Sequence, residues 1–328
     1  MTTSGNWNYN RTRDQIIQLA ARHIQIKEAG QNLEKEYEEV FADLLNVIVK
    51  DWQKDGLHLW KDEEAALFLN VGQRTYEVGA DTRATKGDWV STSTALDITT
   101  TTDLIPVTST TFTAYSGKDY IPQKDDWLGI SINNVLNWYQ VLGNPSATEI
   151  RINGQITDTV DAGETVYIYR EAMDKPLKIY QENVRLWQNN NYELPLHLLD
   201  WTEYNLLPQK DTRGQVVQMF YNPQINTSQI AVWPTTYTVD DVLLFRYQSP
   251  IELFDSASDT QDFPAEWVRA LSWALAAEAG HSFGIPPARQ ASVDARAASL
   301  KEQVLDWDQT NASIFLQPQS YPVGGWYK

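Results

Sequence analysis

The chain has 328 residues, of which 42% are hydrophobic and 21% are charged, so a globular protein with a sizeable core is expected. It has no cysteine, which excludes disulfides and thiolate chemistry, and no apolar run approaches the roughly 20 residues of a membrane span. The net charge of −17 argues against binding to a phosphate backbone, which requires clustered Lys and Arg. The first residues lack the pattern of a signal peptide, so we expect assembly in a cytoplasm.

The acidic excess is concentrated in the middle of the chain. Segment 61–261 carries 27 acidic and 14 basic residues, and so accounts for −13 of the net charge of −17. One interpretation is an ordinary solvated acidic surface. The other is a surface past which a polyanion slides without binding. At physiological salt the repulsion reaches only about 8 Å, so the second interpretation requires a narrow channel.

Two helices are predicted in the N-terminal segment. Thr12 and Gln15 match a capping box, and apolar residues then recur at helical spacing up to Ile24, with Gly30 closing the element. The second helix has the clearest periodicity of the chain and is ended by Gly56. Its predicted apolar face comprises Leu33, Tyr37, Val40, Phe41, Leu44, Leu45, Ile48, Val49 and Trp52.

From Leu57 to about Tyr247 the pattern changes to that of β-strands. Short segments rich in Val, Ile, Thr and aromatic residues alternate with Gly, Pro, Asn and Asp, which predicts a sandwich or barrel-like domain. Within this region, residues 198–208 (LLDWTEYNLLP) predict a short helix. The Ser/Thr-rich run Ser91–Asp103 predicts an exposed, mobile loop.

Helical spacing returns after Pro264. It runs up to Gly280, and Pro286 and Pro287 then open a last helix whose apolar stripe ends at Trp307. We therefore predict an α+β protein in which residues 1–60 and 262–308 form one discontinuous helical bundle. An antiparallel β domain (61–261) is inserted between the two halves, and residues 309–328 follow as an extended C-terminal arm.

Known catalytic and metal-binding motifs give little support for a chemical site. The histidines (His23, His58, His197 and His281) are far apart and never spaced like zinc ligands, so we expect no metal and no cofactor. Phosphate-loop, dinucleotide-binding and nucleophile-elbow patterns are absent from the sequence.

One combination of residues is typical of catalysis on sugars. Abundant Trp and Tyr stand among 43 carboxylates, as in carbohydrate-binding and glycoside-hydrolysing clefts. The candidate residues are Asp125, Asp126 and Trp127, or Asp200, Trp201 and Glu203. The alternative interpretation, which we favour, is turn acids beside core or interface tryptophans. A carbohydrate-binding or glycoside-hydrolysing protein remains the alternative function.

Several motifs, taken in order, carry a resemblance to a known family. They are Thr12–Ile24, the segment VKDWQKDGLHLW (Val49–Trp60), the predicted strand pair Arg213–Pro234, and Tyr247–Ile285 with its acidic loop, Phe263-Pro264 and Ala-rich helix. Together they resemble the head-to-tail adaptors of short-tailed phages, called tail tubular protein A or packaged-DNA stabilisation protein. The resemblance is weakest from Gly87 to Glu171, and AARHIQIKEAG stands where the family usually has a Leu-Gly turn.

This resemblance implies a structural virion protein and not an enzyme. Adaptors of this family form a ring, usually twelve-fold, beneath the portal protein and carry the tail nozzle protein below. The implied partners are therefore the portal, the nozzle and further copies of the chain itself. DNA passes through the channel without sequence-specific binding, and no membrane is involved.

The resemblance also directs attention to particular contacts. We expect the helical bundle to make the ring contacts next to the portal and the β domain to point towards the nozzle. Ring-interface candidates are Trp267, Trp273 and His23. We expect the C-terminal arm to bind the portal through Ile314, Phe315 and Leu316, with Tyr321 and Trp326 as aromatic anchors. The alternative is a strap folded back on its own bundle.

Overall fold

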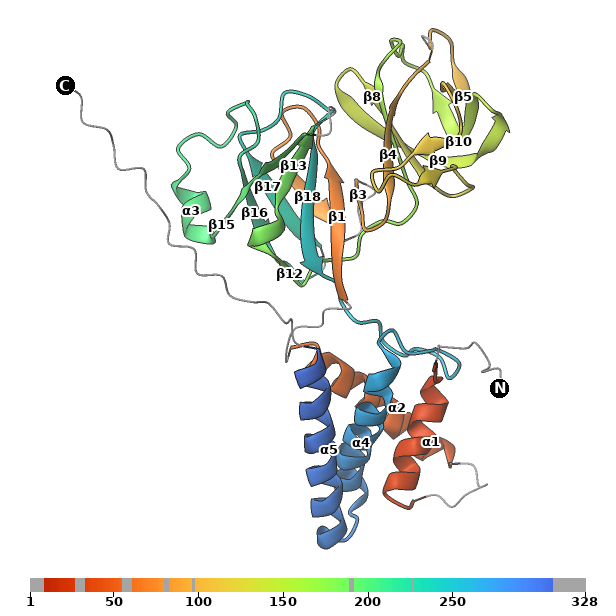
Figure 1. Ribbon diagram of the computed structural model, residues 1–328, viewed down its shortest axis with the longest axis vertical. Coiled ribbons are helices and arrows are strands. Elements are labelled where there is room, and N and C mark those ends of the chain that lie inside the picture. Colours follow the sequence, from red (N-terminus) through yellow and green to blue (C-terminus); the bar gives the residue numbers. More distant parts are fainter. Residues whose placement is uncertain are drawn as a thin grey trace, which may run out of the picture. The chain divides into compact units, whose positions relative to one another are not determined.

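The chain divides into two compact units, which are considered separately (Figure 1). In the computed structural model the described residues are 9–26, 33–54, 61–79, 83–95, 98–188, 192–225 and 227–308. One unit, the β unit, is Trp60–Pro250, and the other, the helical unit, combines Met1–Leu59 with Ile251–Lys328. The described residues form five α-helices and several mainly antiparallel sheets, so the fold is mixed α and β.

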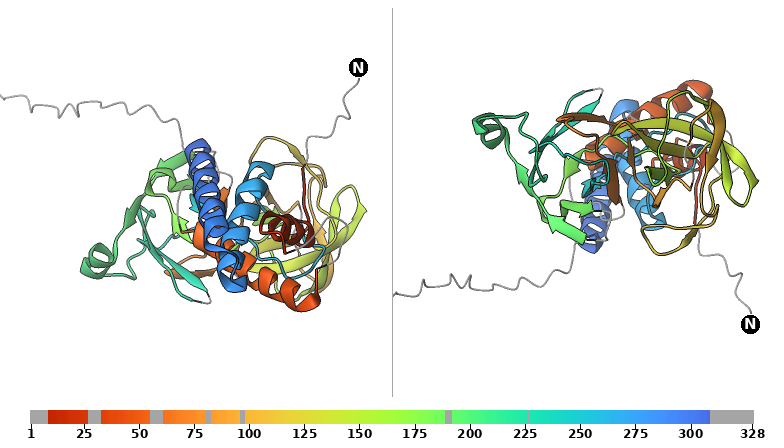
Figure 2. Two further views of the ribbon diagram at one scale, coloured as in Figure 1. Left: turned by 90° about the horizontal axis from the view of Figure 1, so that it is seen from below. Right: turned by 90° about the horizontal axis from the view of Figure 1, so that it is seen from above.

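Four helices make up the described part of the helical unit. They are α1 (Arg13–His23), α2 (Lys35–Trp52), α4 (Ala265–Phe283) and α5 (Pro287–Trp307). Helix α4 contacts each of the other three, and Figure 2 shows it running alongside α5. Its buried Ala270, Ala276 and Ala279 have small side chains that let neighbouring helices approach closely.

The helix ends follow local chemistry. The predicted capping box is confirmed: Gln15 N–H donates to the Thr12 hydroxyl, and the Gln15 side chain accepts from Thr12 N–H, both at 3.4 Å. Helix α1 nevertheless ends at His23, well before Gly30, which lies outside the described residues, as does Gly56. Helix α4 continues past Gly280 to Phe283 and is ended by Gly284, whose φ of 65° suits a residue without Cβ. The start of α5 at Pro287 is confirmed.

The acidic loop before α4 belongs to the helical unit. Asn46 on α2 both donates to Phe254 C=O (3.2 Å) and accepts from Phe254 N–H (3.0 Å). Lys50 donates to Ile251 C=O at 2.6 Å, and Arg13 N–H donates to Asp259 C=O at 2.9 Å. The unit boundary therefore lies at Pro250, because these contacts hold the loop against α1 and α2.

Two sheets of the β unit share one core. The first has the order β14-β13-β18-β1-β3 with β12 also paired to β18, and the second has the order β15-β16-β17-β2. Their inward faces form one buried cluster that includes Leu67, Tyr76, Leu186, Val232 and Phe245. The pair β15–β16 is parallel, and the other pairings between the named strands are antiparallel. The bounds in these two sheets are β1 Asp62–Phe68, β2 Thr75–Val78, β3 Ala84–Thr85, β12 Lys178–Ile179, β13 Arg185–Gln188, β14 Tyr192–Pro195, β15 His197–Leu199, β16 Gln218–Asn222, β17 Ser228–Trp233 and β18 Val242–Gln248.

The remaining large sheet, β4-β11-β8-β9-β10-β5, closes on itself. A bridge between Thr94 and Val107, just beyond β4 and β5, joins its two edges, and Ala95 N–H donates to Pro106 C=O at 3.2 Å. The bounds are β4 Trp89–Ser93, β5 Thr102–Pro106, β8 Trp127–Ile132, β9 Val135–Ser146, β10 Glu149–Ile156 and β11 Thr165–Tyr169, with a separate pair β6 (Phe112–Thr113) and β7 (Asp119–Tyr120). The prediction of a loop over Ser91–Asp103 is thus wrong at both ends of that segment. Ser91–Ser93 belong to β4, and Thr102 and Asp103 belong to β5.

An aromatic cluster lies where the barrel meets the first sheet. Phe68 is at its centre, with the rings of Tyr167, Trp138, Tyr169 and Trp89 at centroid distances of 4.6, 5.3, 5.6 and 5.7 Å. Much of the aromatic content of the middle segment is therefore used in packing. The predicted short helix is confirmed as α3 (Trp201–Leu206), and a 3-10 turn, η2, spans Gln181–Asn183.

Candidate interaction surfaces

Asp126, one of the sugar-site candidates, holds the turn that precedes β8. The residue is only 1% exposed, and its side chain accepts hydrogen bonds from Arg170 Nε (2.9 Å), the Tyr120 hydroxyl (3.0 Å) and Gln123 N–H (2.9 Å). Burial and the adjacent carboxylate raise the pKa of Tyr120, so its phenol remains a donor at neutral pH. The hydrogen bonds of Asp126 therefore give this carboxylate a structural role in the turn. Asp125 beside it is an exposed turn residue with φ of 73°.

The second candidate set is explained by a helix cap. Asp200 accepts from Glu203 N–H at 2.7 Å, and Glu203 accepts from Asp200 N–H at 3.0 Å, which is a capping box at the start of α3. Trp201 packs against Phe220 with ring centroids 5.5 Å apart. The two carboxylates are engaged with backbone amides, and the structure does not bring them together with Asp125 or Asp126.

The histidines lie on separate elements. His23 ends α1, His197 begins β15 and His281 is near the end of α4, whereas His58 lies outside the described residues. The imidazoles of His197 and His281 lie 3.8 and 3.5 Å from single carboxylates, those of Glu203 and Asp294. Within the described segments, no three His, Asp or Glu side chains are grouped so that they could hold a metal ion.

The three ring-interface candidates occupy different environments. Trp267 is 3% exposed and packs on Trp52, with ring centroids 5.4 Å apart, so it belongs to the core of the helical unit within a single chain. His23 and Trp273 are brought together and stack at 4.0 Å with an interplanar angle of 15°. Both are half-buried, so part of this stacked pair remains accessible. The arm residues Ile314, Phe315, Leu316, Tyr321 and Trp326 lie outside the described residues.

Helix α2 carries a second apolar row beside its buried face. The buried face consists of Phe41, Leu45, Ile48, Val49 and Trp52. The second row, here called the α2 row, consists of Tyr37, Val40, Leu44 and Val47, which follow one another at intervals of three or four residues. Val47 is 57% exposed, and Tyr37 and Val40 are also exposed.

The sequence-based prediction placed most of the α2 row in the core, and for Tyr37 and Val40 this is wrong. Nine apolar positions within five turns cover a wide arc of the helix. Helices α4 and α1 both contact α2, and the Tyr37 ring meets Phe283 of α4 edge-on at 5.1 Å, yet Val40 and Val47 remain exposed. The width of the apolar arc was the feature of the sequence that could have indicated an exposed row. Val47 was left out of the predicted apolar face because it falls at the far edge of the arc.

A shallow groove continues this surface. It has a volume of about 210 Å³ and is lined by residues of α2, α4 and α5. Ala274 and Ala277 are among its lining residues, and Lys301 extends over the Trp52 ring, 5.7 Å from its centroid. Asp51, one turn beyond Val47, also lines it, so the groove lies next to the end of the α2 row.

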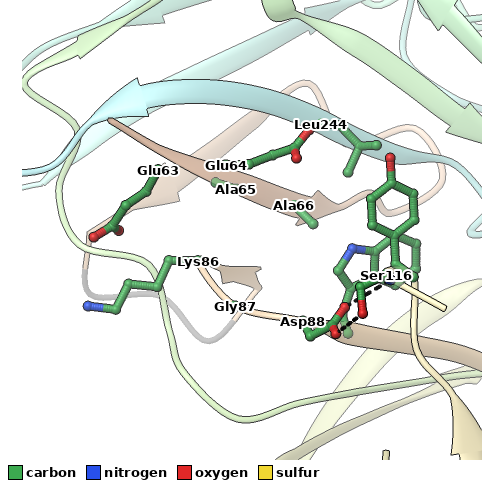
Figure 3. Close-up of a pocket in the computed structure, with 11 residues that line it drawn as sticks. Glu63, Glu64, Ala65, Ala66, Lys86, Gly87, Asp88, Ser116 and Leu244 are labelled. Carbon is green, nitrogen blue, oxygen red and sulfur yellow. Dashed lines mark hydrogen bonds between the residues drawn. The ribbon is translucent and has the colours of Figure 1, made fainter. Parts of the chain in front are cut away.

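The β unit contains a larger cleft that sequence reasoning did not find. One cavity of about 540 Å³ lies between the start of β1 and the segment Lys86–Asp88, as Figure 3 shows. A second cavity of about 630 Å³ shares two of its lining residues, Trp89 and Tyr115. Their rings stack at 5.3 Å with an interplanar angle of 12°. The elements that build the cleft are far apart in sequence, so no local pattern predicts it.

Comparison with known proteins adds no family assignment: no family model matches the sequence, and no curated protein matches it. Among the helices of the described segments, none combines the length and apolar character needed to cross a membrane.

Proposed function

We propose that this protein is a structural head-to-tail adaptor of a phage virion. Copies of the chain would form a ring, usually twelve-fold in the family it resembles, below the portal protein and above the tail nozzle protein. The channel of the ring would let DNA pass without sequence-specific contacts. The proposal is supported by the ordered sequence motifs and by the structural roles found for both candidate carboxylate sets.

In this proposal the N- and C-terminal helices act as one discontinuous bundle that makes the ring contacts. The β unit is the insertion, directed towards the nozzle, and residues 309–328 form the arm that binds the portal. The net charge of the middle segment supports a conduit, because carboxylates near a channel repel the DNA backbone within about 8 Å. The stacked pair His23–Trp273 and the α2 row are the accessible ring-contact candidates.

The α2 row is the observation that carries the proposal. Tyr37, Val40 and Val47 are exposed and Leu44 among them is half-buried, and an apolar row of this kind is typical of a surface that another polypeptide covers. In a ring each copy presents one surface to the next copy and a different surface to the previous one. The groove next to the end of this row, lined in part by alanines, gives such a neighbour room for side chains.

The test is complementation of virions that lack the protein. Without it, particles should lose packaged DNA and carry no tails, and the wild-type protein should restore both. We expect the double variant Val40→Glu, Val47→Glu to remain a folded monomer, because both side chains are exposed, and to reduce tailed, DNA-filled particles at least tenfold. Tails are counted by electron microscopy, and retained DNA is measured by nuclease protection.

Val217→Glu is the matched control. Val217 is 47% exposed, close to the exposure of Val47, but lies in the β unit, so this variant should complement like the wild type. Null particles that keep both DNA and tails would show the adaptor assignment to be wrong. If the null particles fail but the double variant complements fully, the assignment stands and the α2 row is not the ring contact.

A further inference from the structure

Strand β1 has an open edge over its first half. On one side β1 pairs with β18 along its whole length, from Asp62–Gln248 to Phe68–Val242. On the other side it pairs with β3 only through Ala66 and Leu67. The described residues therefore supply no strand partner for positions 62–65 on this second side.

The register shows which backbone groups face the open edge. Phe68 N–H donates to Arg83 C=O at 2.9 Å on the β3 side, whereas Leu69 N–H donates to Asp241 C=O on the β18 side. Backbone groups alternate between the two edges of a strand, so the even positions, including Glu64 and Asp62, face the open edge. Each presents an N–H and a C=O that a further strand could pair.

The chain after β3 turns away and leaves space beside this edge. Lys86 N–H donates to Glu171 C=O at 3.3 Å, and Gly87 N–H donates to the Thr85 hydroxyl at 3.1 Å, so neither amide continues the ladder with β1. The resulting space is the cavity of about 540 Å³, with Glu63–Ala66 on one side and Lys86–Asp88 on the other (Figure 3). A Cβ added to Gly87 would meet no atom within 4 Å, which confirms that the space is open there.

The lining of this cavity is acidic. Glu63, Glu64 and Asp88 contribute carboxylates, and Lys86, which is paired with Asp174 at 2.8 Å, is the one cation among the described lining residues. Glu193 adds a carboxylate to the adjoining cavity and accepts a hydrogen bond from the Tyr115 hydroxyl at 2.7 Å. Arg185 behind the lining pairs with Glu64 and with Glu193, so Glu63 and Asp88 are the carboxylates without an ion pair to Arg185. Burial and Glu193 raise the pKa of Tyr115, so its hydroxyl does not ionise near neutral pH.

An aromatic surface lies at the end of the cavity. Trp89 is buried and supports the partly exposed Tyr115 ring by stacking, while Trp187 meets Trp89 edge-on at 5.0 Å. A rigid, accessible aromatic face beside carboxylates attracts the ammonium or guanidinium group of Lys or Arg. The cavity therefore combines an unpaired strand edge, an acidic lining and a site for a cationic side chain.

We propose that this groove binds an extended, basic segment of a partner polypeptide as an added strand beside β1. The four positions of the open edge span about 13 Å, so the bound strand would be three or four residues long. Main-chain hydrogen bonds would supply binding, and basic side chains at alternate positions would supply specificity. The inference uses only groups of the β unit and does not depend on the adaptor proposal.

The probe is a library of acetylated hexapeptides with Lys or Arg at alternate positions and Val, Ile, Thr or Tyr between them. We expect members of the library to bind the full chain with Kd below about 100 µM by fluorescence anisotropy. Binding should weaken as salt increases. The same peptides with Glu in place of Lys and Arg should not bind, and N-methylation at the edge-pairing amides should weaken binding at least tenfold.

Two substitutions at one position locate the site. Gly87→Trp adds a bulky side chain at a position where a Cβ meets no atom within 4 Å, and should weaken peptide binding at least tenfold, whereas Gly87→Ala should stay within twofold of the wild type. The double variant Glu63→Gln, Asp88→Asn keeps hydrogen-bond acceptors but removes two charges, and should weaken binding at least fivefold. Circular dichroism confirms that each variant is folded.

Three outcomes would overturn the proposal. The first is failure of the whole library to bind the wild-type chain at millimolar concentration. The second is binding that survives Gly87→Trp or N-methylation unchanged, since the peptide would then lie elsewhere or pair no backbone. The third is binding of neutral oligosaccharides, displaced by Gly87→Trp, in the absence of peptide binding, which would assign the aromatic and acidic groups to a sugar.

Discussion

The helical unit and the β unit leave different kinds of surface uncovered. In the helical unit the other three described helices each pack against α4, and the α2 row remains largely exposed. In the β unit one group of aromatic side chains packs around Phe68, and what remains on β1 is an unpaired stretch of backbone. Apolar side chains favour a permanent neighbour, whereas an open strand edge favours an extended segment. The two units therefore offer chemically different surfaces for binding a partner.

The largest expected effect tests whether the helical unit is stabilised mainly within one chain. Trp267→Ala removes a buried ring that packs on Trp52, so we expect the free energy of unfolding to fall by about 3–5 kcal/mol. Urea unfolding of the monomer, followed by the helical circular dichroism signal, measures the change. Trp307→Ala, at a position that is 62% exposed on α5, is the control and should change stability by less than about 0.5 kcal/mol. A loss below about 1 kcal/mol for Trp267→Ala would contradict a single-chain core role.

A smaller effect tests the packing of the β unit. Gly129 on β8 lies opposite Trp138 on β9, and a Cβ at residue 129 would be 2.6 Å from the indole ring. Because Trp138 is itself held against Phe68, Gly129→Ala should destabilise the unit by about 1–3 kcal/mol. Thermal unfolding followed by tryptophan fluorescence measures the loss, with Gly87→Ala as the control at an open position. Equal stability of the two variants would mean that the ring can move freely.

The two units also differ in how far sequence predicts them. The Thr12–Gln15 cap, the start of α5 at Pro287 and the short helix α3 were all predictable, because each depends on residues a few positions apart. Strand segments were recognised by composition, but the pairing of Asp62 with Gln248 joins residues that no local pattern connects. For the same reason neither the barrel closure at Thr94–Val107 nor the cleft beside β1 could be predicted.

Long-range contacts also decided which candidate residues came together. His23 and Trp273 were selected separately, and their stacking follows from the packing of α1 on α4. Asp126 was selected for its neighbour Trp127, yet its partner is Arg170 on the segment after β11. The sequence identified candidate residues by their types and their neighbours along the chain, but it could not distinguish surface positions from core positions. For that reason most of the α2 row was included in the predicted apolar face of the second helix.

The smallest expected effect is a pH dependence at the His23–Trp273 stack. Burial, and then the charge of Arg269, lower the pKa of His23 from its usual value of 6.5. Below pH 6.5 the unfolded chain therefore binds a proton at His23 more readily than the folded chain does. The contribution of His23 to stability is complete above pH 6.5 and is lost as the pH falls towards the lowered pKa.

His23→Gln isolates this contribution from the titration of the carboxylates. Gln is uncharged at every pH, and it can keep the weak 3.4 Å contact that the imidazole Nε2 makes with the Ser272 hydroxyl. The stability of the wild type relative to the variant should decrease between about pH 7.5 and pH 5.5, measured by urea unfolding at each pH. A constant difference would show that the imidazole titrates equally in both states, and an increase towards low pH would reverse the sign of the prediction.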